Sequence, residues 1–296
     1  MKVSGFTFLR NARKLGYPFA ESIRSILPIV DEYIIALGPS EDQTEEVLRE
    51  IGDPRIRIIR TQWNEGIRND LALKGFVYGQ QKSIALFNCT GDWAFYLEGD
   101  ELVHEDDLPK IQEAMRKHLD DRRVEALFFN YIHFWGNRDT YVSCPSWYRT
   151  APRIVRNNLT IWAPKGLFFI VMDSKRRGRY PRAASAEARI FHYGNIRSKE
   201  EYDLKTMSVY KYWGNTPKFI HYGDIDPQIL KLFTGTHPKA AQSWLPPAQG
   251  LFQPPPERRL TVEDRRHRWM ARIERWLGVD LTHRHYRRVK SRNQAP

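Results

Sequence analysis

The chain has 296 residues, a formal net charge of +12 at pH 7 and an apolar content of 41%. These values describe a folded globular protein, long enough for one large domain with an appendage, and they exclude an intrinsically disordered chain. No apolar run approaches the roughly 18 residues of a membrane-spanning helix, and no signal peptide is expected. The two cysteines, Cys89 and Cys144, lack a metal-binding spacing, so we expect reduced thiols and a cytoplasmic protein.

The first hundred residues alternate between strand-like and helix-like patterns, which predicts a parallel sheet with helices on both faces. In such sheets ligands bind beyond the carboxyl ends of the strands, so the loops that follow the strands should meet at one edge. The expected strands are residues 3–9, 33–37, 55–60 and 92–97, and the expected helices are residues 17–27, 44–51 and 71–86.

The fourth of these strands ends abruptly in a cluster of acidic side chains. Its apolar run, Trp93 to Leu97, is followed by Glu98, Asp100 and Glu101 with only a glycine between them. Crowded carboxylates repel one another unless something positive lies between them, and hard oxygen ligands suit Mg²⁺ or Mn²⁺. The alternative is a strand followed by a solvated acidic turn. The convergence of the strand-end loops favours the cation site.

Five short motifs follow one another along this half of the chain. They are Phe8-Leu-Arg-Asn-Ala12, Ser40-Glu-Asp-Gln-Thr44, Gln81-Lys-Ser83, Thr90-Gly91 and Glu98-Gly-Asp-Glu101. In this order they make residues 1–108 resemble the nucleotide-sugar half of GT-A glycosyltransferases, in particular the family 2-like group. The resemblance implies an α/β, Rossmann-like fold with a mostly parallel central sheet flanked by helices. It also implies an inverting transferase that takes a nucleotide-diphospho-sugar as its donor.

The chain departs from the family's pattern at three positions of these motifs. Leu37 and Gly38 stand where paired aspartates are common, so recognition of the base or the ribose must differ or use the main chain. Glu98 replaces an aspartate, which lengthens the side chain by one methylene group. Ser83 stands where the family often has an asparagine.

The resemblance implies roles for individual residues around the donor. Asp100 would bind Mn²⁺ or Mg²⁺ directly and bridge it to the diphosphate, while Glu98 would face the ribose or a metal-bound water. Lys82 would lie near the nucleotide, although an ordinary lysine on the surface of its helix is the alternative. Asp42 would shape the turn beside the nucleotide, or serve only as a helix cap. The residues expected around the nucleotide are Phe8, Arg10, Asn11, Gly38, Ser40, Asp42, Lys82, Glu98 and Gly99.

Residues 109–225 should form the acceptor half of the same domain, as the resemblance implies. A helix is expected at residues 109–119, and strands are expected at 126–135 and 189–194. The aromatic residues of this half suit sugar binding, because flat rings pack against sugar C–H groups, although most will belong to the core. The resemblance makes His192 the second metal ligand; the alternative is a core histidine.

An inverting transferase needs a carboxylate that takes the proton from the acceptor hydroxyl. Glu187 matches best by its position shortly before His192, although the family's common Glu-Asp pair is missing here. Asp139 and Asp173 are the alternatives.

The last segment, residues 226–296, has a different character. Residues 243–256 are rich in proline and indicate an irregular linker, and Thr261 caps an expected helix that ends at Leu277. Residues 257–296 hold twelve Lys or Arg and five Asp or Glu. A basic helix with tryptophans fits peripheral contact with a membrane surface. It fits equally a helix packed on its own domain or on a second subunit.

These features predict a metal-dependent glycosyltransferase that moves a sugar from a nucleotide-diphospho-sugar to a glycan or lipid-linked acceptor. By analogy, the acceptor belongs to a cell-envelope polysaccharide and the enzyme works at the inner face of the plasma membrane. One alternative is a sugar nucleotidyltransferase, but residues 10–15 lack the glycine-rich loop that such enzymes carry after the first strand. The other is a basic nucleic-acid-binding protein, which the acidic cluster argues against because carboxylates repel phosphate.

Overall fold

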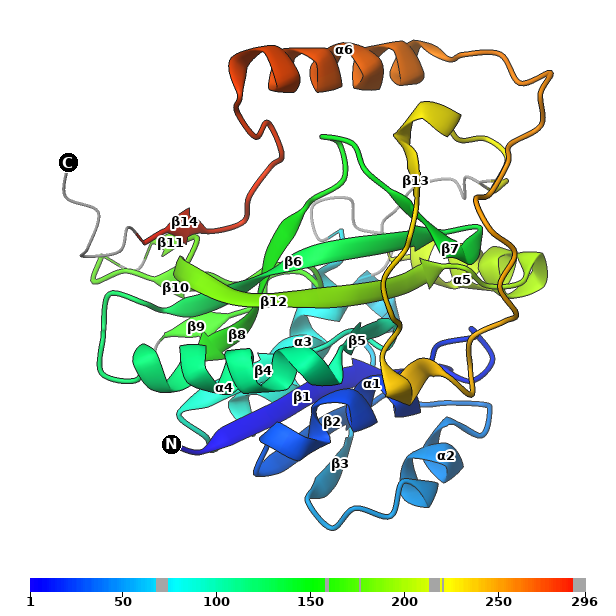
Figure 1. Ribbon diagram of the computed structural model, residues 1–296. Helices are drawn as coiled ribbons and strands as arrows, with labels where there is room; N and C mark the ends of the chain where they lie inside the picture. The colour runs from blue at the N-terminus through cyan, green and yellow to red at the C-terminus, as the bar shows by residue number, and fades with distance from the viewer. Residues whose placement is uncertain (68–73, 158–159, 176, 213–218, 220, 290–296) are drawn as a thin grey trace.

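One large mixed sheet runs through the molecule, with helices on both of its faces (Figure 1). The computed structural model describes residues 1–67, 74–157, 160–175, 177–212, 219 and 221–289. Within these residues the large sheet has 11 strands and a second, small sheet has 3. The arrangement confirms the predicted α/β class.

The N-terminal half of the large sheet is parallel. Its strands are β1 (Val3–Leu9), β2 (Glu32–Leu37), β3 (Ile56–Arg60) and β4 (Trp93–Tyr96). They lie in the order β4-β1-β2-β3, and each neighbouring pair is parallel. All four carboxyl ends therefore meet at one edge, as the alternating sequence pattern predicted.

Three helices connect these strands. They are α1 (Phe19–Ile26), α2 (Thr44–Glu50) and α3 (Phe76–Phe87). The first passes into the 3-10 turn η1 (Leu27–Ile29), where Pro28 has no amide hydrogen to continue an α-helix. The helix expected at residues 71–86 begins at Phe76, and residues 71–73 lie outside the described part of the chain.

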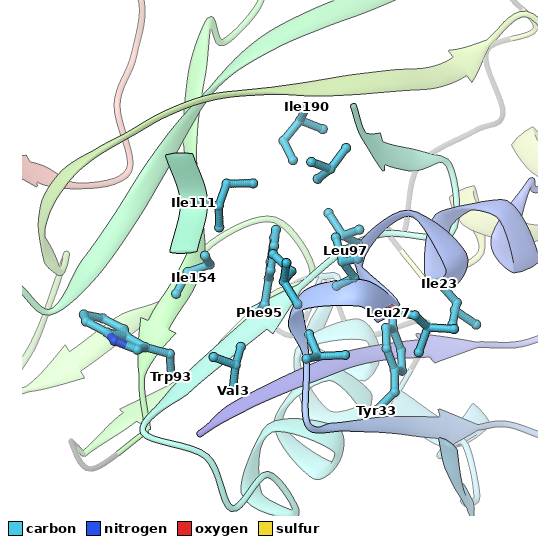
Figure 2. Packing of buried hydrophobic residues seen from close by; sticks show 14 of the residues in the cluster. Val3, Ile23, Leu27, Tyr33, Trp93, Phe95, Leu97, Ile111, Ile154 and Ile190 are labelled. Carbon is cyan, nitrogen blue, oxygen red and sulfur yellow. The ribbon is translucent and has the colours of Figure 1, made fainter. Parts of the chain in front are cut away.

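The hydrophobic core fills both faces of the parallel strands, because successive side chains point to opposite faces. Figure 2 shows one face, where Tyr33 and Phe95 lie in one cluster with Ile23 of α1 and Ile111 of α4 (Leu108–Lys117). On the opposite face the strands pack against α3. Burial on both faces explains why these strands read as continuous apolar runs.

The second half of the sheet is mostly antiparallel. Its strands are β5 (Glu101–Val103), β6 (Ala126–Trp135), β7 (Asn137–Val142), β8 (Thr150–Arg156), β12 (Arg182–Asn195) and β13 (Leu230–Leu232). The sheet follows the order β13-β7-β6-β8-β4-β1-β2-β3, and β12 pairs with β6 and β5 beside this path. The pairing of β12 with β5 sets His192 opposite Glu101, next to the acidic loop.

The strand expected at residues 189–194 is longer than predicted. It is the end of β12, which covers 14 residues. The pairing with β6 shifts register between Ser185 and Arg189, and Glu187 has a φ of 54° within this irregularity. A bulge interrupts the period-2 pattern of a strand, so the sequence indicated only the part beyond it.

The remaining elements lie at the rim of the sheet. They are the small sheet of β9 (Ile161–Trp162), β10 (Ile170–Met172) and β11 (Gly178–Arg179), the helices α5 (Lys199–Tyr210) and α6 (Val262–Leu277), the strand β14 (Arg287–Arg288), and the turns η2 (Glu65–Ile67), η4 (Glu105–Asp107), η5 (Pro227–Ile229) and η6 (Lys239–Ala241). Thr261 caps α6 as predicted. Among the described residues, no helix combines the length and apolar character needed to span a membrane.

Candidate active site

A cavity of about 290 Å³ lies at the carboxyl ends of β1 and β4, and α5 forms one of its walls. This is the edge of the sheet at which the sequence predicted a ligand site. Seven of the predicted site residues line the cavity, namely Phe8, Arg10, Asn11, Glu98, Gly99, Asp100 and His192.

The loops that follow β1 and β2 are tied together by their polar side chains. The Asn11 amide donates to Ser40 Oγ at 3.0 Å, and the Glu41 amide donates to Asn11 Oδ1 at 2.8 Å. Asn11 has a φ of 50°, a left-handed conformation that asparagine tolerates better than most residues. Asp42 Oδ1 accepts from the amide and the hydroxyl of Thr44, the first residue of α2. Ser40 and Asp42 thus shape the loops around the cavity without lining it.

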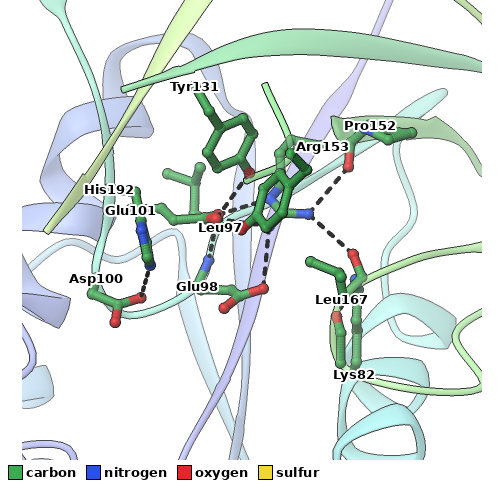
Figure 3. A network of polar contacts seen from close by, with 12 residues as sticks. Lys82, Leu97, Glu98, Asp100, Glu101, Tyr131, Pro152, Arg153, Leu167 and His192 are labelled. Carbon is green, nitrogen blue, oxygen red and sulfur yellow. Dashed lines mark hydrogen bonds and ion pairs between the residues drawn. The ribbon is translucent and has the colours of Figure 1, made fainter. Parts of the chain in front are cut away.

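Two of the three acidic side chains after β4 are bridged by a buried arginine (Figure 3). Arg153 of β8 donates from Nε and Nη2 to the two oxygens of Glu101, both at 2.7 Å, and from Nη2 to Glu98 Oε1 at 3.1 Å. Tyr131 donates to the same Glu101 carboxylate at 2.8 Å. Burial and the neighbouring Glu101 raise the pKa of Glu98 to about 7. Arg153 therefore lies between Glu98 and Glu101, where its positive charge offsets their repulsion.

The third acid, Asp100, is ionised, and only one of its two carboxylate oxygens accepts hydrogen bonds from the described residues. Its Oδ2 accepts from Arg197 Nη2 at 2.8 Å and from Lys205 Nζ at 3.1 Å. Burial alone would raise the pKa of this carboxyl, but the cations Lys205 and Arg197 hold it well below its usual range. Its Oδ1 is buried and has no hydrogen-bond partner among the described residues.

The tautomer of His192 is fixed by a chain of hydrogen bonds that ends at a carbonyl group. His133 Nε2 lies 2.8 Å from the carbonyl oxygen of Tyr148, and His133 Nδ1 lies 3.0 Å from His192 Nδ1. A carbonyl oxygen can only accept, so in a neutral His133 the proton is on Nε2 and Nδ1 is the acceptor. His133 is neutral because burial and the adjacent His192 lower its pKa to about 3. His192 Nδ1 must therefore donate, and since burial also lowers the pKa of His192, its Nε2 keeps a free lone pair.

Asp100 and His192 together form a place where a divalent cation fits. Asp100 Oδ1 and His192 Nε2 lie 3.7 Å apart at the cavity wall. Two groups that present lone pairs to each other at this distance repel unless a positive charge lies between them. A carboxylate and a neutral imidazole are a suitable ligand pair for Mn²⁺, and phosphate oxygens and water commonly supply the remaining ligands of such ions.

The sequence did not predict the three cations that contact the acidic loop. Arg153, Arg197 and Lys205 lie between 52 and 105 positions away in the chain from the acids that they contact. Pairs at such separations leave no periodic signal. The only indication in the sequence was the crowding of Glu98, Asp100 and Glu101, which required nearby positive charge.

Lys82 lies beneath the cavity and does not line it. Its side chain is fully buried, so it is no ordinary lysine of a helix surface. Its Nζ donates to the carbonyl oxygen of Gly166 at 2.7 Å and lies 3.8 Å from the ring centroids of both Tyr96 and Phe169. Burial and the nearby Arg153 lower the pKa of this lysine well below its usual value. Lys82 thus fixes the segment that carries Gly166, a residue of the cavity wall.

An aromatic wall explains why a glycine stands at position 38. A Cβ atom on Gly38 would lie 2.2 Å from Trp63 Nε1, so no larger residue fits beneath this ring. Trp63 has its ring centroid 6.3 Å from that of Phe8, 5.6 Å from that of Tyr78 and 5.3 Å from that of Tyr212. All four rings line the cavity. Trp63 therefore occupies the space beside the residue that stands where the resembled family often has an aspartate.

Further cationic side chains belong to the same cavity. Arg10 Nη1 donates to Tyr212 Oη at 2.7 Å and pairs with Glu65, and its guanidinium lies 5.2 Å from the ring of Trp63. Lys205 and Lys211 line the cavity on the side of α5. Positive side chains thus surround a cavity that also contains the ionised Asp100.

The fold does not bring the carboxylates expected to act as base to this cavity. Glu187 is exposed in the bulge of β12, where its own amide donates to Ser185 Oγ. Asp139 Oδ2 accepts from the amides of Gln249 and Gly250 at 2.6 and 2.7 Å, and so holds the proline-rich segment against β7. The alternative, Asp173, accepts hydrogen bonds within its own turn, including one from the Arg177 amide. Among the described residues, the carboxylates that line the cavity are Glu98 and Asp100.

Comparison with known proteins relates part of the chain to a family. A model of the family described as glycosyl transferase family 2 matches residues 18–158, slightly less than half of the chain. The matched region contains α1, the acidic loop and Arg153. A search of curated proteins found no match.

Three solved structures illustrate the structural similarity. S. aureus TarS is 14% identical over 70% of this chain and 39% of its own, with a TM-score of 0.40. TarS 1–349 is 14% identical over 76% of this chain and 69% of its own, with a TM-score of 0.39. Glucosyl-3-phosphoglycerate synthase from Mycobacterium tuberculosis, in complex with Mn²⁺, uridine diphosphate and phosphoglyceric acid, is 18% identical over 45% of this chain and 43% of its own, with a TM-score of 0.30. The chain thus spans less than half the length of the first and the last of these proteins.

Proposed function

We propose a donor and a reaction for this chain from the premise that it is a family 2-like glycosyltransferase with a GT-A fold. The proposed donor is a nucleotide-diphospho-sugar, and the proposed acceptor is a hydroxyl group of a glycan or of a lipid-linked glycan. We expect inversion at the sugar carbon, as the resemblance to the family implies. The observation that carries the proposal is the cavity in which an acid–histidine pair, several cations and an aromatic wall meet.

The cations of the cavity support a place for the diphosphate. Arg10, Lys205 and Lys211 line it, and each side chain can donate to a phosphate oxygen. Negative charge builds up on the diphosphate as the bond to the sugar breaks. Positive groups that are already fixed beside it stabilise that charge without having to reorganise, which lowers the barrier.

Asp100 and His192 would hold the divalent cation, Mn²⁺ or Mg²⁺, through Oδ1 and Nε2. When bound, the ion would neutralise part of the diphosphate charge. Other residues of the chain prepare these two side chains to bind the ion. Arg197 and Lys205 hold Asp100 ionised, and His133 directs the lone pair of His192 toward Asp100.

The aromatic wall supports a place for the base of the nucleotide. Phe8, Trp63 and Tyr78 offer apolar ring faces on which a flat base can stack. Trp63 Nε1 is buried and has no hydrogen-bond partner among the described residues. Because this nitrogen lies against Gly38, the ring would offer the base its flat face rather than its donor.

We place the reaction in the cytoplasm and on a cell-envelope glycan. The free, buried thiols of Cys89 and Cys144 are those expected of a protein from a reducing compartment. The proposal of an envelope glycan as acceptor rests on the family resemblance and on the basic C-terminal helix.

Thermal unfolding tests the donor proposal. The protein should be heated with UDP, GDP, dTDP and their sugar conjugates, each with and without Mn²⁺. A ligand at about 100 times its Kd adds about 2.7 kcal/mol, which for a chain of this size raises Tm by about 5 °C. We expect a shift of this order for one nucleotide, and a larger shift when Mn²⁺ is present.

The variant Asp100→Asn tests the contribution of the cation separately from that of the other site residues. The amide oxygen can still accept from Arg197, so the variant should fold, lose the Mn²⁺-dependent part of the shift and lose turnover with the stabilising donor. The matched control is Asp120→Asn, which changes an exposed acid far from the cavity. Stabilisation by DNA regardless of metal, with no response to any nucleotide diphosphate, would refute the proposal.

A further inference from the structure

Helix α6 presents its tryptophans to solvent. Val262, Trp269 and Trp276 follow one another at intervals of seven residues, so they lie along one face of the helix. Their exposed fractions are 83%, 63% and 84%. Figure 1 shows α6 at the end of the molecule, set apart from the central sheet. Two tryptophans with this much exposure on one helix form an unusual surface for a soluble domain.

The opposite side of α6 is held to the domain by ion pairs. Glu274 pairs with Arg149 at 2.8 Å, and Arg268 pairs with Asp226 at 2.7 Å. A helix that only covers a domain turns its apolar side inward and its charges outward. Since α6 does the reverse, its apolar side is directed at something other than this chain.

Arginines border the exposed tryptophans. Arg265, Arg266 and Arg272 are exposed on or beside the same face, and none of them forms an ion pair within the described residues. Glu263 is the one exposed acid of the helix. Val279, just beyond the helix, is a further exposed apolar residue. The outer face of α6, meaning Val262, Trp269, Trp276 and these three arginines, is therefore both aromatic and basic.

We propose that the outer face of α6 docks on an anionic lipid surface. Tryptophan rings are favoured at the boundary between headgroups and acyl chains, where one end is apolar and the other is hydrated. Arginines beside them reach lipid phosphates, and each adds to the attraction of a negatively charged leaflet. A second copy of the chain complements this face poorly, because arginines would meet arginines. The proposal stands on α6 alone and is independent of the nucleotide in the cavity.

Vesicle co-sedimentation tests the docking surface. The full chain is mixed with phosphatidylcholine vesicles that contain or lack phosphatidylglycerol. We expect binding to the anionic vesicles, weakened by salt, and little binding to the neutral ones. Trp269→Ala/Trp276→Ala should reduce the binding about tenfold or more, since it removes most of the apolar area. Arg265→Gln/Arg272→Gln should reduce it about tenfold and weaken its salt dependence.

Matched controls alter the same residue types elsewhere. Phe87→Ala removes an exposed aromatic ring at the end of α3, and Arg116→Gln/Lys117→Gln removes two exposed cations of α4. Both should bind the vesicles like the unaltered chain. All variants should keep the thermal shift with nucleotide, so a failure of docking is distinguishable from a failure of the donor proposal. Equal binding by the tryptophan variant would overturn the proposal. A dimer in solution that this variant dissociates would overturn it in favour of a second copy.

Discussion

At the scale of single residues, His133 determines what His192 can do. Its Nε2 donates a hydrogen bond to the carbonyl oxygen of Tyr148, and its Nδ1 accepts a hydrogen bond from His192 Nδ1. Partners of this kind set the orientation and basicity of metal-binding histidines. His133 therefore acts as a positioning residue, since it does not line the cavity itself.

Replacing His133 with phenylalanine should weaken Mn²⁺ binding. The ring keeps its approximate volume but no longer accepts from His192, which can then turn its protonated nitrogen toward Asp100. We expect the Mn²⁺ affinity, measured by electron paramagnetic resonance in the presence of the nucleotide, to fall about 10- to 100-fold. Nitrogen NMR should show the proton of His192 on Nδ1 in the unaltered chain and a mixed tautomer in the variant.

A conservative change provides the control. His133→Gln can still donate to the carbonyl of Tyr148 and accept from His192, so it should restore most of the affinity. His118→Phe changes a histidine at the end of α4 and should have no effect. Unchanged Mn²⁺ affinity in His133→Phe, with His192 still protonated on Nδ1, would show that the position of His192 does not depend on His133.

The sequence identified some of these residues and missed others for a physical reason. Asp100 and His192 were predicted at the site, and both line the cavity. Each belongs to a short motif at the end of a strand, and motifs are local. Arg153 and Lys205 were missed because they reach the site only through tertiary contacts. The place of Trp63 in the cavity wall was not predicted, because only the fold shows its ring lying beside Gly38.

At the scale of secondary structure, the patterns predicted the strands well where the chain is regular. Residues 126–135 and 3–9 were expected as strands and form β6 and β1 with the same bounds. The bulge in β12 could not be predicted, because it breaks the alternation on which such predictions depend. The position of Glu187 follows from this bulge, so the sequence could not show that the side chain lies outside the cavity.

Glu125 joins the beginnings of β6 and β12 through charged hydrogen bonds. Its carboxylate accepts from both Nη atoms of Arg179 at 2.7 Å, and from the amide and Nη2 of Arg182 at 2.8 Å. Burial alone would raise the pKa of this group, but these hydrogen bonds lower it from 4.5 to about 2. The folded state therefore binds the proton more weakly than the unfolded state.

This difference predicts an acid-sensitive contribution to stability. The contribution is complete above pH 4.5 and is lost as the pH falls toward 2, where the carboxyl becomes protonated in both states. Glu125→Gln should lower the free energy of unfolding at neutral pH by about 2–3 kcal/mol. Denaturant titrations over this pH range should show the difference from the unaltered chain shrinking toward zero in acid.

Glu113→Gln is the control, because Glu113 is exposed on α4. It should unfold like the unaltered chain at every pH. A difference between Glu125→Gln and the unaltered chain that stays constant down to pH 2 would contradict the proposed origin of the effect.

At the scale of the whole molecule, two surfaces with different chemistry lie on one scaffold. The cavity is built where the parallel strands end, and the cations that line it are Arg10 after β1, Lys205 of α5 and Lys211 just beyond α5. Helix α6 is held in place by ion pairs from its opposite side to Arg149, just before β8, and to Asp226, just before η5. The sequence predicted the fold class and the basic helix, but whether the tryptophans of α6 face inward or outward depends on these tertiary ion pairs.

The central claim is that Asp100 and His192 hold a divalent cation beside a nucleotide diphosphate. The most direct measurement is the anomalous scattering of Mn²⁺ in crystals grown with MnCl₂ and the nucleotide that stabilises the protein best. We predict a peak between Asp100 Oδ1 and His192 Nε2, with the diphosphate beside Lys205. A bound nucleotide whose phosphates contact Lys205 and Lys211, with no anomalous peak between Asp100 and His192, would contradict the cation. A cavity without nucleotide would contradict the donor.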